Sequence, residues 1–310
     1  MFWEICNCPH YFESIDEQSK PCHSILQSQV REFLNIDQTQ PDLEKLPRPI
    51  PWVGDIHQKE LMFLHCSPNI PDILTIPTWE DAPWPVTEVV NFEHNTHSQP
   101  YKLELKTFDR SKHESNKSNT EKQTFRLDRQ ILLFKFAQEI SNLILENKKD
   151  EVQAEADFTL VNLVRCPSKS KSAILGALNF CSTNWLLPTI LESKSKIIFV
   201  LGQKPASVLS RLFPDQVPVN WGSFSSQGKK YGQGFWPRSK GDLQDNLTNG
   251  AWDFQHQKKN TFRLKLGDRV ILVVFYSTPG SGALWSIKNH PSLVSKELIA
   301  YWRYFLAENA

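Results

Sequence analysis

The sequence predicts an α/β fold, a three-layer α/β/α sandwich around a central, mainly parallel, four-stranded sheet. The first observation behind this prediction is a set of four short apolar runs that have the length of buried strands. The second is that helical patterns, with apolar residues on one stripe, lie between these runs. Strands that alternate with helices along a chain favour a parallel sheet with right-handed crossovers.

The predicted strands are continuously apolar and rich in β-branched residues, as expected when helices cover both faces of a sheet. They span Leu61 to His65, Phe158 to Val164, Ile197 to Leu201 and Val270 to Tyr276. Ligands of such sheets bind beyond the carboxyl ends of the strands. A site is therefore expected within His65 to Asp72, Asn162 to Cys166, Gly202 to Lys204 and Ser277 to Trp285.

The helices are predicted from apolar periodicity. One stripe with helical spacing consists of Leu132, Leu133, Phe136, Ala137, Ile140, Leu143 and Ile144. Further helices are predicted over Ser172 to Leu187, Pro205 to Phe213 and Ser292 to Leu306. Because proline lacks a backbone N–H, we expect the helix that begins at Ser172 to end near Pro188.

Two polar segments interrupt the alternation of strands and helices. Asn91 to Gln123 is charged, and Asn220 to Lys259 is rich in Gly, Trp, Lys and Gln. Long segments of this kind are typical of mobile insertions or binding loops. We expect residues 1–50 to form a cysteine-bearing extension packed on the core. Residues 51–310 are then one α/β domain with insertions near 91–123 and 220–259.

The composition indicates a folded protein with almost no net charge. The chain has 310 residues, 40% hydrophobic and 22% charged, with a formal net charge of +1. Contact with DNA would therefore need a local basic patch. Because no run approaches the length of a membrane span and no leader pattern opens the chain, we expect a cytoplasmic monomer with no membrane partner. Six cysteines in that compartment predict thiols or metal ligands, with scattered core cysteines as the alternative.

The most discriminating stretch is Val161-Asn162-Leu163-Val164-Arg165-Cys166, with a second cysteine at Cys181. It resembles the strand-end motif of the iron-sulfur branch of the uracil-DNA glycosylase superfamily. In that family the Asn reads an extruded base and the Cys holds a cluster, so the resemblance makes Asn162 the base-binding residue. An Asn side chain offers both donors and an acceptor to a pyrimidine taken out of the stack. A buried Asn that bonds neighbouring backbone is the alternative.

The resemblance also implies a four-iron, four-sulfur (4Fe-4S) cluster, which takes four thiolates. Fourteen residues separate Cys166 from Cys181, placing one at a strand end and the other on the next helix. The family has two more cysteines near the amino terminus. The favoured ligands are Cys8, Cys22, Cys166 and Cys181, with Cys6 as a substitute for Cys8. A Cys₄ zinc site is the alternative, because it needs the same count and His23 lies beside Cys22.

Leu61 to Asn69 is similar to the family's first motif, an apolar strand followed by a turn with proline. In the family this turn reads Gly-Glu-Ala-Pro-Gly or a variant with Asp or Asn, and its polar group positions a water against the sugar. Here His65, Cys66 and Ser67 replace the first three residues, so the carboxylate is missing. The resemblance implies base contacts from Cys66 and Ser67, and places Asn69 and Asp72 as candidates to hold or activate the water. An ordinary surface turn is the alternative.

The family's third motif, His-Pro-Ser with an apolar wedge, stabilises the departing base. Two placements are open. Thr278 follows the last predicted strand, with Ser281 and the wedge Leu284 or Trp285 after it, whereas His290 begins a literal His-Pro-Ser further on. Proline in a first helical turn explains the second match equally well.

A basic loop between Gly222 and Lys240 interleaves cations with aromatics. Lys229, Lys230 and Arg238 stand among Tyr231, Phe235 and Trp236. Such a loop suits contact with phosphate and stacking on bases. A solvated basic loop is the alternative.

By resemblance, the chain is expected to be a DNA glycosylase that flips uracil or a modified pyrimidine and hydrolyses its N-glycosidic bond. The altered motifs favour a modified base, such as one in foreign DNA, so both DNA repair and antiviral defence are open. One alternative is a catalytically silent member that binds DNA or a partner. The other is an unrelated nucleotide-acting α/β enzyme, although the chain has no glycine-rich phosphate loop.

Overall fold

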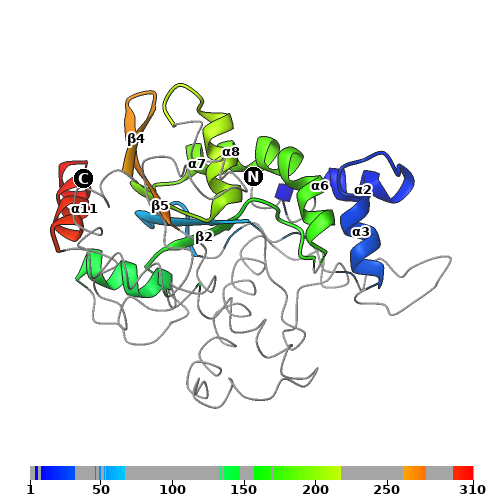
Figure 1. Cartoon of the computed structure of the whole chain (residues 1–310), viewed down its shortest axis with the longest axis horizontal. Helices are drawn as coiled ribbons and strands as arrows, with labels where there is room; N and C mark the ends of the chain where they lie inside the picture. Colours follow the sequence, from blue (N-terminus) through cyan, green and yellow to red (C-terminus); the bar gives the residue numbers. More distant parts are fainter. Residues whose placement is uncertain are drawn as a thin grey trace, which may run out of the picture.

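The strands in the described part of the chain form one five-stranded sheet in the order β2-β1-β3-β5-β4 (Figure 1). This computed structural model describes residues 4–5, 8–31, 46, 49, 52, 54–66, 133, 136–146, 157–168, 170–217, 261–276 and 296–309. The strands are β1 (Leu61–His65), β2 (Thr159–Asn162), β3 (Ile197–Leu201), β4 (Thr261–Leu266) and β5 (Arg269–Tyr276). The predicted α/β fold with a mainly parallel sheet is therefore confirmed.

The sheet has five strands where the sequence predicted four. β2, β1, β3 and β5 are parallel neighbours, whereas β4 pairs antiparallel with β5 at the edge. A search for continuously apolar runs misses β4, because its apolar residues alternate with Thr261, Arg263 and Lys265 and the strand is partly exposed. The strand joins β5 through Gly267, whose φ of 62° fits a tight hairpin turn.

A long helical crossover joins β2 to β3. It comprises α6 (Lys171–Cys181), a π-helical turn η5 (Ser182–Leu186) and α7 (Leu187–Glu192). The predicted end near Pro188 is wrong, because this proline lies in the first turn of α7, where a missing N–H is tolerated. By length and composition, Lys171–Glu192 is long and apolar enough to cross a membrane, although it packs here in part on the protein core, with 39% of its most apolar window buried.

Aromatic side chains mark the face of the sheet that the remaining helices cover. Phe63 of β1 stacks on Phe199 of β3 with 4.8 Å between ring centroids. Phe136, in a helix over residues 136–145, meets Phe63, and Trp302 of α11 (Lys296–Glu308) meets Phe199. This helix and α11 lie on one side of the sheet and α7 and α8 on the other (Figure 1).

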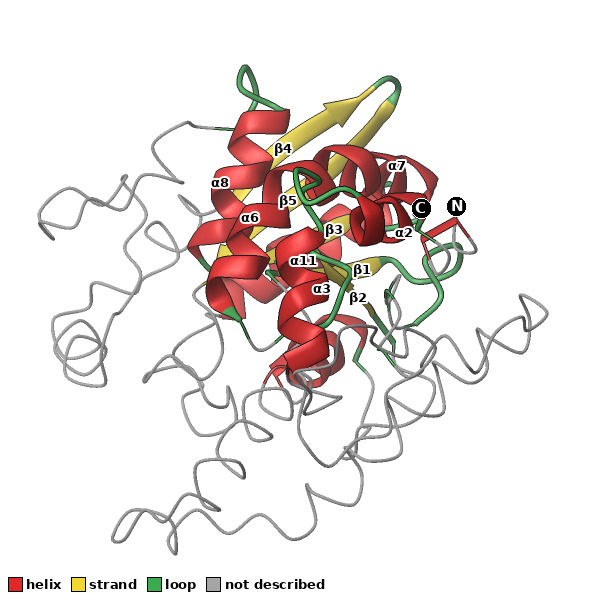
Figure 2. Cartoon of the chain, turned by 90° about the vertical axis from the view of Figure 1, so that its right-hand side faces the viewer, coloured by secondary structure: helices red, strands yellow, loops and turns green. Residues whose placement is uncertain are grey.

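Helix α8 (Gln203–Leu212) follows β3 and lies beside α6. Figure 2 shows the two helices side by side in front of the strands, and Arg211 donates a hydrogen bond to Asn179 Oδ1 at 2.6 Å. In sheets of this kind a ligand crevice forms where the strand order reverses. Here the chain passes from β1 to β2 on one side of β1 and then from β2 to β3 on its other side, so the crevice is expected between the carboxyl ends of β1 and β3. Any ligand of the sheet is expected at this edge.

Candidate functional site

Four cysteines from distant parts of the chain lie in one buried cluster. Cys8 and Cys22 immediately precede helices α2 (Pro9–Asp16) and α3 (His23–Gln29), Cys166 follows β2, and Cys181 is the last residue of α6. Each is at most 6% exposed. The structure thus brings together the four residues that the sequence predicted as ligands of one centre.

The mutual electrostatics of the four thiols show how close they are. Burial, together with the charges of Cys181 and Cys8, raises the pKa of Cys22 to about 12. Burial is also the largest cause of the raised pKa of Cys166, and the charges of Cys22, Cys8 and Cys181 add to it. The charge of Cys8 also raises the pKa of Cys181. Ionisation of Cys22, Cys166 and Cys181 is thus opposed both by burial and by at least one neighbouring cysteine. Only a bound cation would make four buried thiolates favourable here.

Several N–H groups are directed at the cysteine sulfurs. The backbone N–H of Arg165 donates to Sγ of Cys181 at 3.4 Å. Burial raises the pKa of Cys8, but the backbone N–H groups of Tyr11 and His10 and the side chain of Trp185 oppose that rise. Trp185 lies in the π-helical turn η5. Hydrogen bonds to sulfur are one way in which proteins tune iron–sulfur centres.

Buried hydrogen bonds hold the amino-terminal helices against the loop that carries Cys166. Gln29 of α3 donates from Nε2 to the carbonyl oxygen of Pro167 at 2.7 Å and accepts from the Tyr11 hydroxyl at 2.5 Å. Ser168 donates to the Ser28 hydroxyl at 3.0 Å. These contacts fix the positions of Cys8 and Cys22 relative to Cys166.

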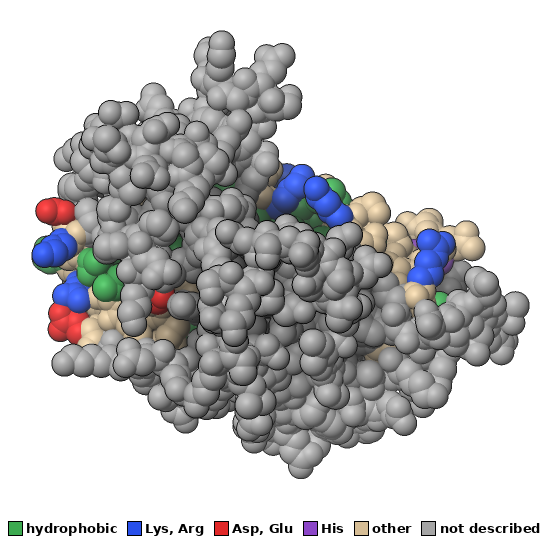
Figure 3. Space-filling model, turned by 60° about the horizontal axis from the view of Figure 1, so that its bottom comes forward, with side chains coloured by type: hydrophobic (Ala, Val, Ile, Leu, Met, Phe, Trp, Pro, Cys, Tyr) green, Lys and Arg blue, Asp and Glu red, His purple; other side chains and the backbone are tan. Residues whose placement is uncertain are grey.

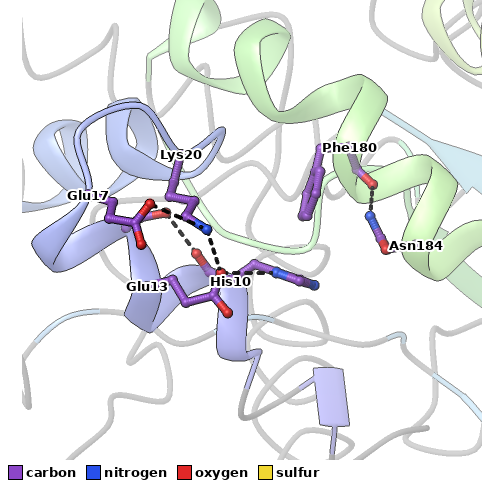
Figure 4. A network of polar contacts seen from close by, with 7 residues as sticks. His10, Glu13, Glu17, Lys20, Phe180 and Asn184 are labelled. Carbon is purple, nitrogen blue, oxygen red and sulfur yellow. Dashed lines mark hydrogen bonds and ion pairs between the residues drawn. The ribbon is translucent and has the colours of Figure 1, made fainter.

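A second contact region joins α2 to the end of α6. The ring of His10 packs edge-on against the ring of Phe180, with 4.6 Å between the ring centroids (Figure 4). Phe180 immediately precedes Cys181 in the chain. Lys20 pairs with Glu13 at 3.2 Å and with Glu17 at 3.5 Å, which folds the segment before Cys22 back onto α2. Exposed ion pairs of this kind contribute little to stability, so they guide the turn more than they stabilise it.

His23 does not join the cluster. Its Nδ1 lies 2.8 Å from the carbonyl oxygen of Ser14, and its Nε2 lies 2.8 Å from Nε2 of Gln27. Both ring nitrogens are thus engaged. Within the described ranges, no three His, Cys, Asp or Glu side chains lie close enough to hold a single metal ion. Cys6 lies outside those ranges.

Arg165 is a buried cation at the edge of the cysteine cluster. The residue is 1% exposed, and its Nη2 donates to Thr189 Oγ1 at 2.9 Å. Burial lowers the pKa of Arg165 to about 10, and the charge of Cys181 opposes this shift. Burial also raises the pKa of Cys181, to about 11. The main group that opposes this rise is Arg165. Guanidinium and thiolate therefore stabilise each other's charge.

Asn162 lies at the carboxyl end of β2, where the sheet is expected to bind a ligand. It pairs in register with His65 at the end of β1 and is 5% exposed. In the part of the chain that the structure describes, its side-chain amide makes no hydrogen bond. A buried amide is normally satisfied. Among the described residues, the donors and the acceptor of the Asn162 amide therefore have no partner at the edge where a ligand would bind.

Cys66 follows β1 at the same edge. Burial raises its pKa to about 11, opposed by the charge of Lys204 in the first turn of α8. The thiol is thus neutral near pH 7, and it cannot act as a base there. It remains available as a weak hydrogen-bond donor.

The other predicted site residues lie outside the described residues. These are Ser67, Asn69 and Asp72 after β1, Lys229, Lys230 and Arg238 in the basic loop, and Thr278, Ser281, Leu284 and His290 after β5. On the face shown in Figure 3, the described Lys and Arg side chains form small separate groups, one of them beside a hydrophobic area. The catalytic, base-binding and DNA-binding roles predicted for these residues stay predictions.

The chain matches no protein-family profile and no curated protein. Its function is therefore inferred from the geometry of the cysteine cluster and of Asn162. Sequence reasoning missed Arg165, Thr189, Trp185 and Gln29 as parts of this region. One signal was available, because Arg165 is a lone charged residue in the short run that ends at Cys166.

Proposed function

We propose that this protein is a DNA glycosylase that reads an extruded pyrimidine with Asn162 and contains a metal centre held by four cysteines. The observation that carries the proposal is the buried amide of Asn162, which makes no hydrogen bond within the described residues, at the carboxyl end of β2. The cysteine cluster begins beyond the same strand end, at Cys166. A base reader and a thiol ligand thus share one short segment.

The amide of Asn162 suits the Watson–Crick edge of uracil or a modified pyrimidine. Its oxygen accepts from the ring N–H, and its NH₂ donates to a ring carbonyl. Hydrolysis then forms a bond between a water oxygen and the anomeric carbon of the sugar. The N-glycosidic bond breaks, the base leaves with the bonding electrons and takes up a proton, and an abasic site remains. The altered first motif supports a modified base, including one in foreign DNA, over plain uracil.

The chemistry of the cluster fits a 4Fe-4S group, for which Cys8, Cys22, Cys166 and Cys181 would be the ligands. Burial opposes ionisation of all four thiols, and neighbouring cysteines oppose it further at Cys22, Cys166 and Cys181, so the four need a cation to become thiolates together. A single zinc ion would need sulfurs about 3.8 Å apart, from Zn–S bonds of about 2.3 Å, whereas bridging sulfides keep the thiolates of a four-iron cluster further apart. The centre would tie the amino-terminal helices to the sheet.

A catalytically silent protein that binds DNA through the same edge is the second candidate. Cys66 stands where the family resemblance places a carboxylate, and burial keeps its thiol neutral by raising its pKa to about 11. A neutral thiol cannot activate water. Asn162 would still contact a base in such a protein, so binding and excision must be measured separately.

The decisive experiment is a panel of duplexes that carry uracil or modified pyrimidines, followed by alkaline cleavage of abasic sites. We expect strand scission with at least one modified pyrimidine and none with the undamaged duplex. Retained DNA binding without scission on any substrate would support the silent protein instead. The metal centre is tested independently by measuring the iron, sulfide and zinc content of anaerobically purified protein. Absorption at about 400 nm would indicate the iron–sulfur cluster.

A further inference from the structure

Arg165 lies directly beside two members of the cysteine cluster. It precedes Cys166 in the chain, and its backbone N–H donates to Sγ of Cys181 at 3.4 Å. The guanidinium side chain is 1% exposed, so water screens its charge little. A buried cation is therefore held beside the cysteine cluster.

The guanidinium is kept in place by a chain of hydrogen bonds that reaches the other side of the cluster. Thr189 accepts from Arg165 Nη2 at 2.9 Å and donates from the same hydroxyl to the carbonyl oxygen of Trp185 at 2.6 Å. The Trp185 side chain acts in turn on the Cys8 thiol. The π-helical turn that contains Trp185 follows directly after Cys181. Two of the four sulfurs are thus linked through Arg165, Thr189 and Trp185.

The charge of a four-thiolate centre explains why a cation would be buried here. Four thiolates around a divalent zinc ion or a 4Fe-4S core of the same charge leave about two negative charges. Burying that charge is costly unless opposite charge or hydrogen bonds lie close to it. We propose that Arg165 is the counter-charge of this centre, a positioning residue that retains the metal and favours its reduced form. This inference rests on the proposed metal centre and not on DNA excision.

The test compares variants that differ in the charge at position 165. Arg165→Met removes the charge at similar length, Arg165→Lys keeps it, and Arg263→Met removes an exposed charge from β4 at the far edge of the sheet. We expect metal release to a chelator to be about 10- to 100-fold faster in Arg165→Met, as for other groups that support metal ligands. Arg165→Lys should stay closer to wild type, and Arg263→Met should match it.

If the centre is an iron–sulfur cluster, its midpoint potential gives a second readout. Loss of a nearby positive charge should lower the potential of Arg165→Met, with a tenfold change in the one-electron equilibrium equal to about 59 mV. A purely structural role would leave the potential of the intact cluster unchanged. Unaltered release and potential in folded Arg165→Met would overturn the proposal.

A matched pair at Thr189 covers the case in which Arg165→Met does not fold. Thr189→Val removes the oxygen that holds the guanidinium, whereas Thr189→Ser keeps it. Faster metal release in the valine variant alone supports the counter-charge, and equal release in both overturns it. Wild-type protein without any metal would reject the centre and the role of Arg165 together. The excision assay reports on the glycosylase proposal separately.

Discussion

The side-chain amide of Gln29 donates a hydrogen bond to the carbonyl oxygen of Pro167 at 2.7 Å, across 138 residues of sequence. Because Pro167 follows Cys166 and Gln29 ends the helix that begins after Cys22, this bond sets the distance between the two cysteines. The amide is fully buried and also accepts from the Tyr11 hydroxyl. It is therefore a structural support of the cysteine cluster.

Gln29→Leu is expected to destabilise the protein by about 1–3 kcal/mol, because it leaves the buried Pro167 carbonyl and Tyr11 hydroxyl without this partner. Urea unfolding of the metal-free protein measures the effect. Gln27→Leu on the same helix is the control, since Gln27 is exposed and should change stability by less than about 0.5 kcal/mol. Equal effects at the two positions would show that the link between α3 and Pro167 contributes nothing.

Gly54→Ala is expected to cost about 3 kcal/mol or more, because two effects add. Gly54 has φ of 84°, and a Cβ there would lie 2.3 Å from the backbone oxygen of Phe158. Gly267→Ala is the matched control, with φ of 62° but nothing within 4 Å of its Cβ. It should cost only the roughly 1–2 kcal/mol of a left-handed conformation. Thermal and urea unfolding would separate the two, and similar costs would refute the steric explanation.

The sequence predicted the buried strands well because their signal is local. β1 and β3 have the predicted bounds, Leu61–His65 and Ile197–Leu201, since a strand covered on both faces is continuously apolar. β4 was missed because an edge strand is half polar, although its strict alternation and the Gly267 turn were readable signals. The course of the helix through Pro188 depended on the preceding π-helical turn, which no local pattern revealed.

The candidate site was partly predictable for a similar reason. Residue type and spacing singled out Asn162, Cys166 and Cys181, and the structure places them at the expected strand end and helix. The supporting groups Arg165 and Gln29 act through contacts between distant segments. Such contacts depend on how α3 and α6 pack together, so a search for local patterns could not find them.

The thiol of Cys66 is expected to react slowly with iodoacetamide at pH 8. Its pKa is about 11 in the folded protein against 9.0 for an ordinary thiol, so its thiolate fraction is about 100-fold lower. Burial stabilises the neutral form, and the rate should rise as pH approaches 11. Mass spectrometry of the modified Cys66 peptide measures the rate, with urea-unfolded protein as reference. A folded rate equal to the unfolded one would contradict this prediction.

Lys204→Met should slow that reaction further, because the Lys204 ammonium is the group that opposes the rise in the Cys66 pKa. Lys204→Arg keeps the charge and should react at the wild-type rate. An increase in rate in the methionine variant would instead indicate that Lys204 mainly shields the thiol from the reagent.

Asn162→Leu should separate function from stability at the sheet edge. The Asn162 amide is buried and makes no hydrogen bond among the described residues, so an apolar side chain of similar size removes the cost of burying an unused polar group. We expect the free energy of unfolding to stay the same or rise by about 1 kcal/mol, while excision and binding of the extruded base are lost. Residues that bind ligands commonly oppose stability in this way.

Asn162→Asp is the companion variant, because a carboxylate keeps the size and an acceptor but loses the amide donors. It should lose base recognition, and burial of its charge should destabilise it where the leucine variant is stable. Calorimetric unfolding and the excision assay are run on the same preparations. If Asn162→Leu is destabilised by more than about 2 kcal/mol, the amide already makes a hydrogen bond within the protein. Asn162 would then no longer be the proposed base-binding residue. An unchanged excision rate in the leucine variant would remove Asn162 from the site, because an aliphatic side chain cannot pair with a pyrimidine edge.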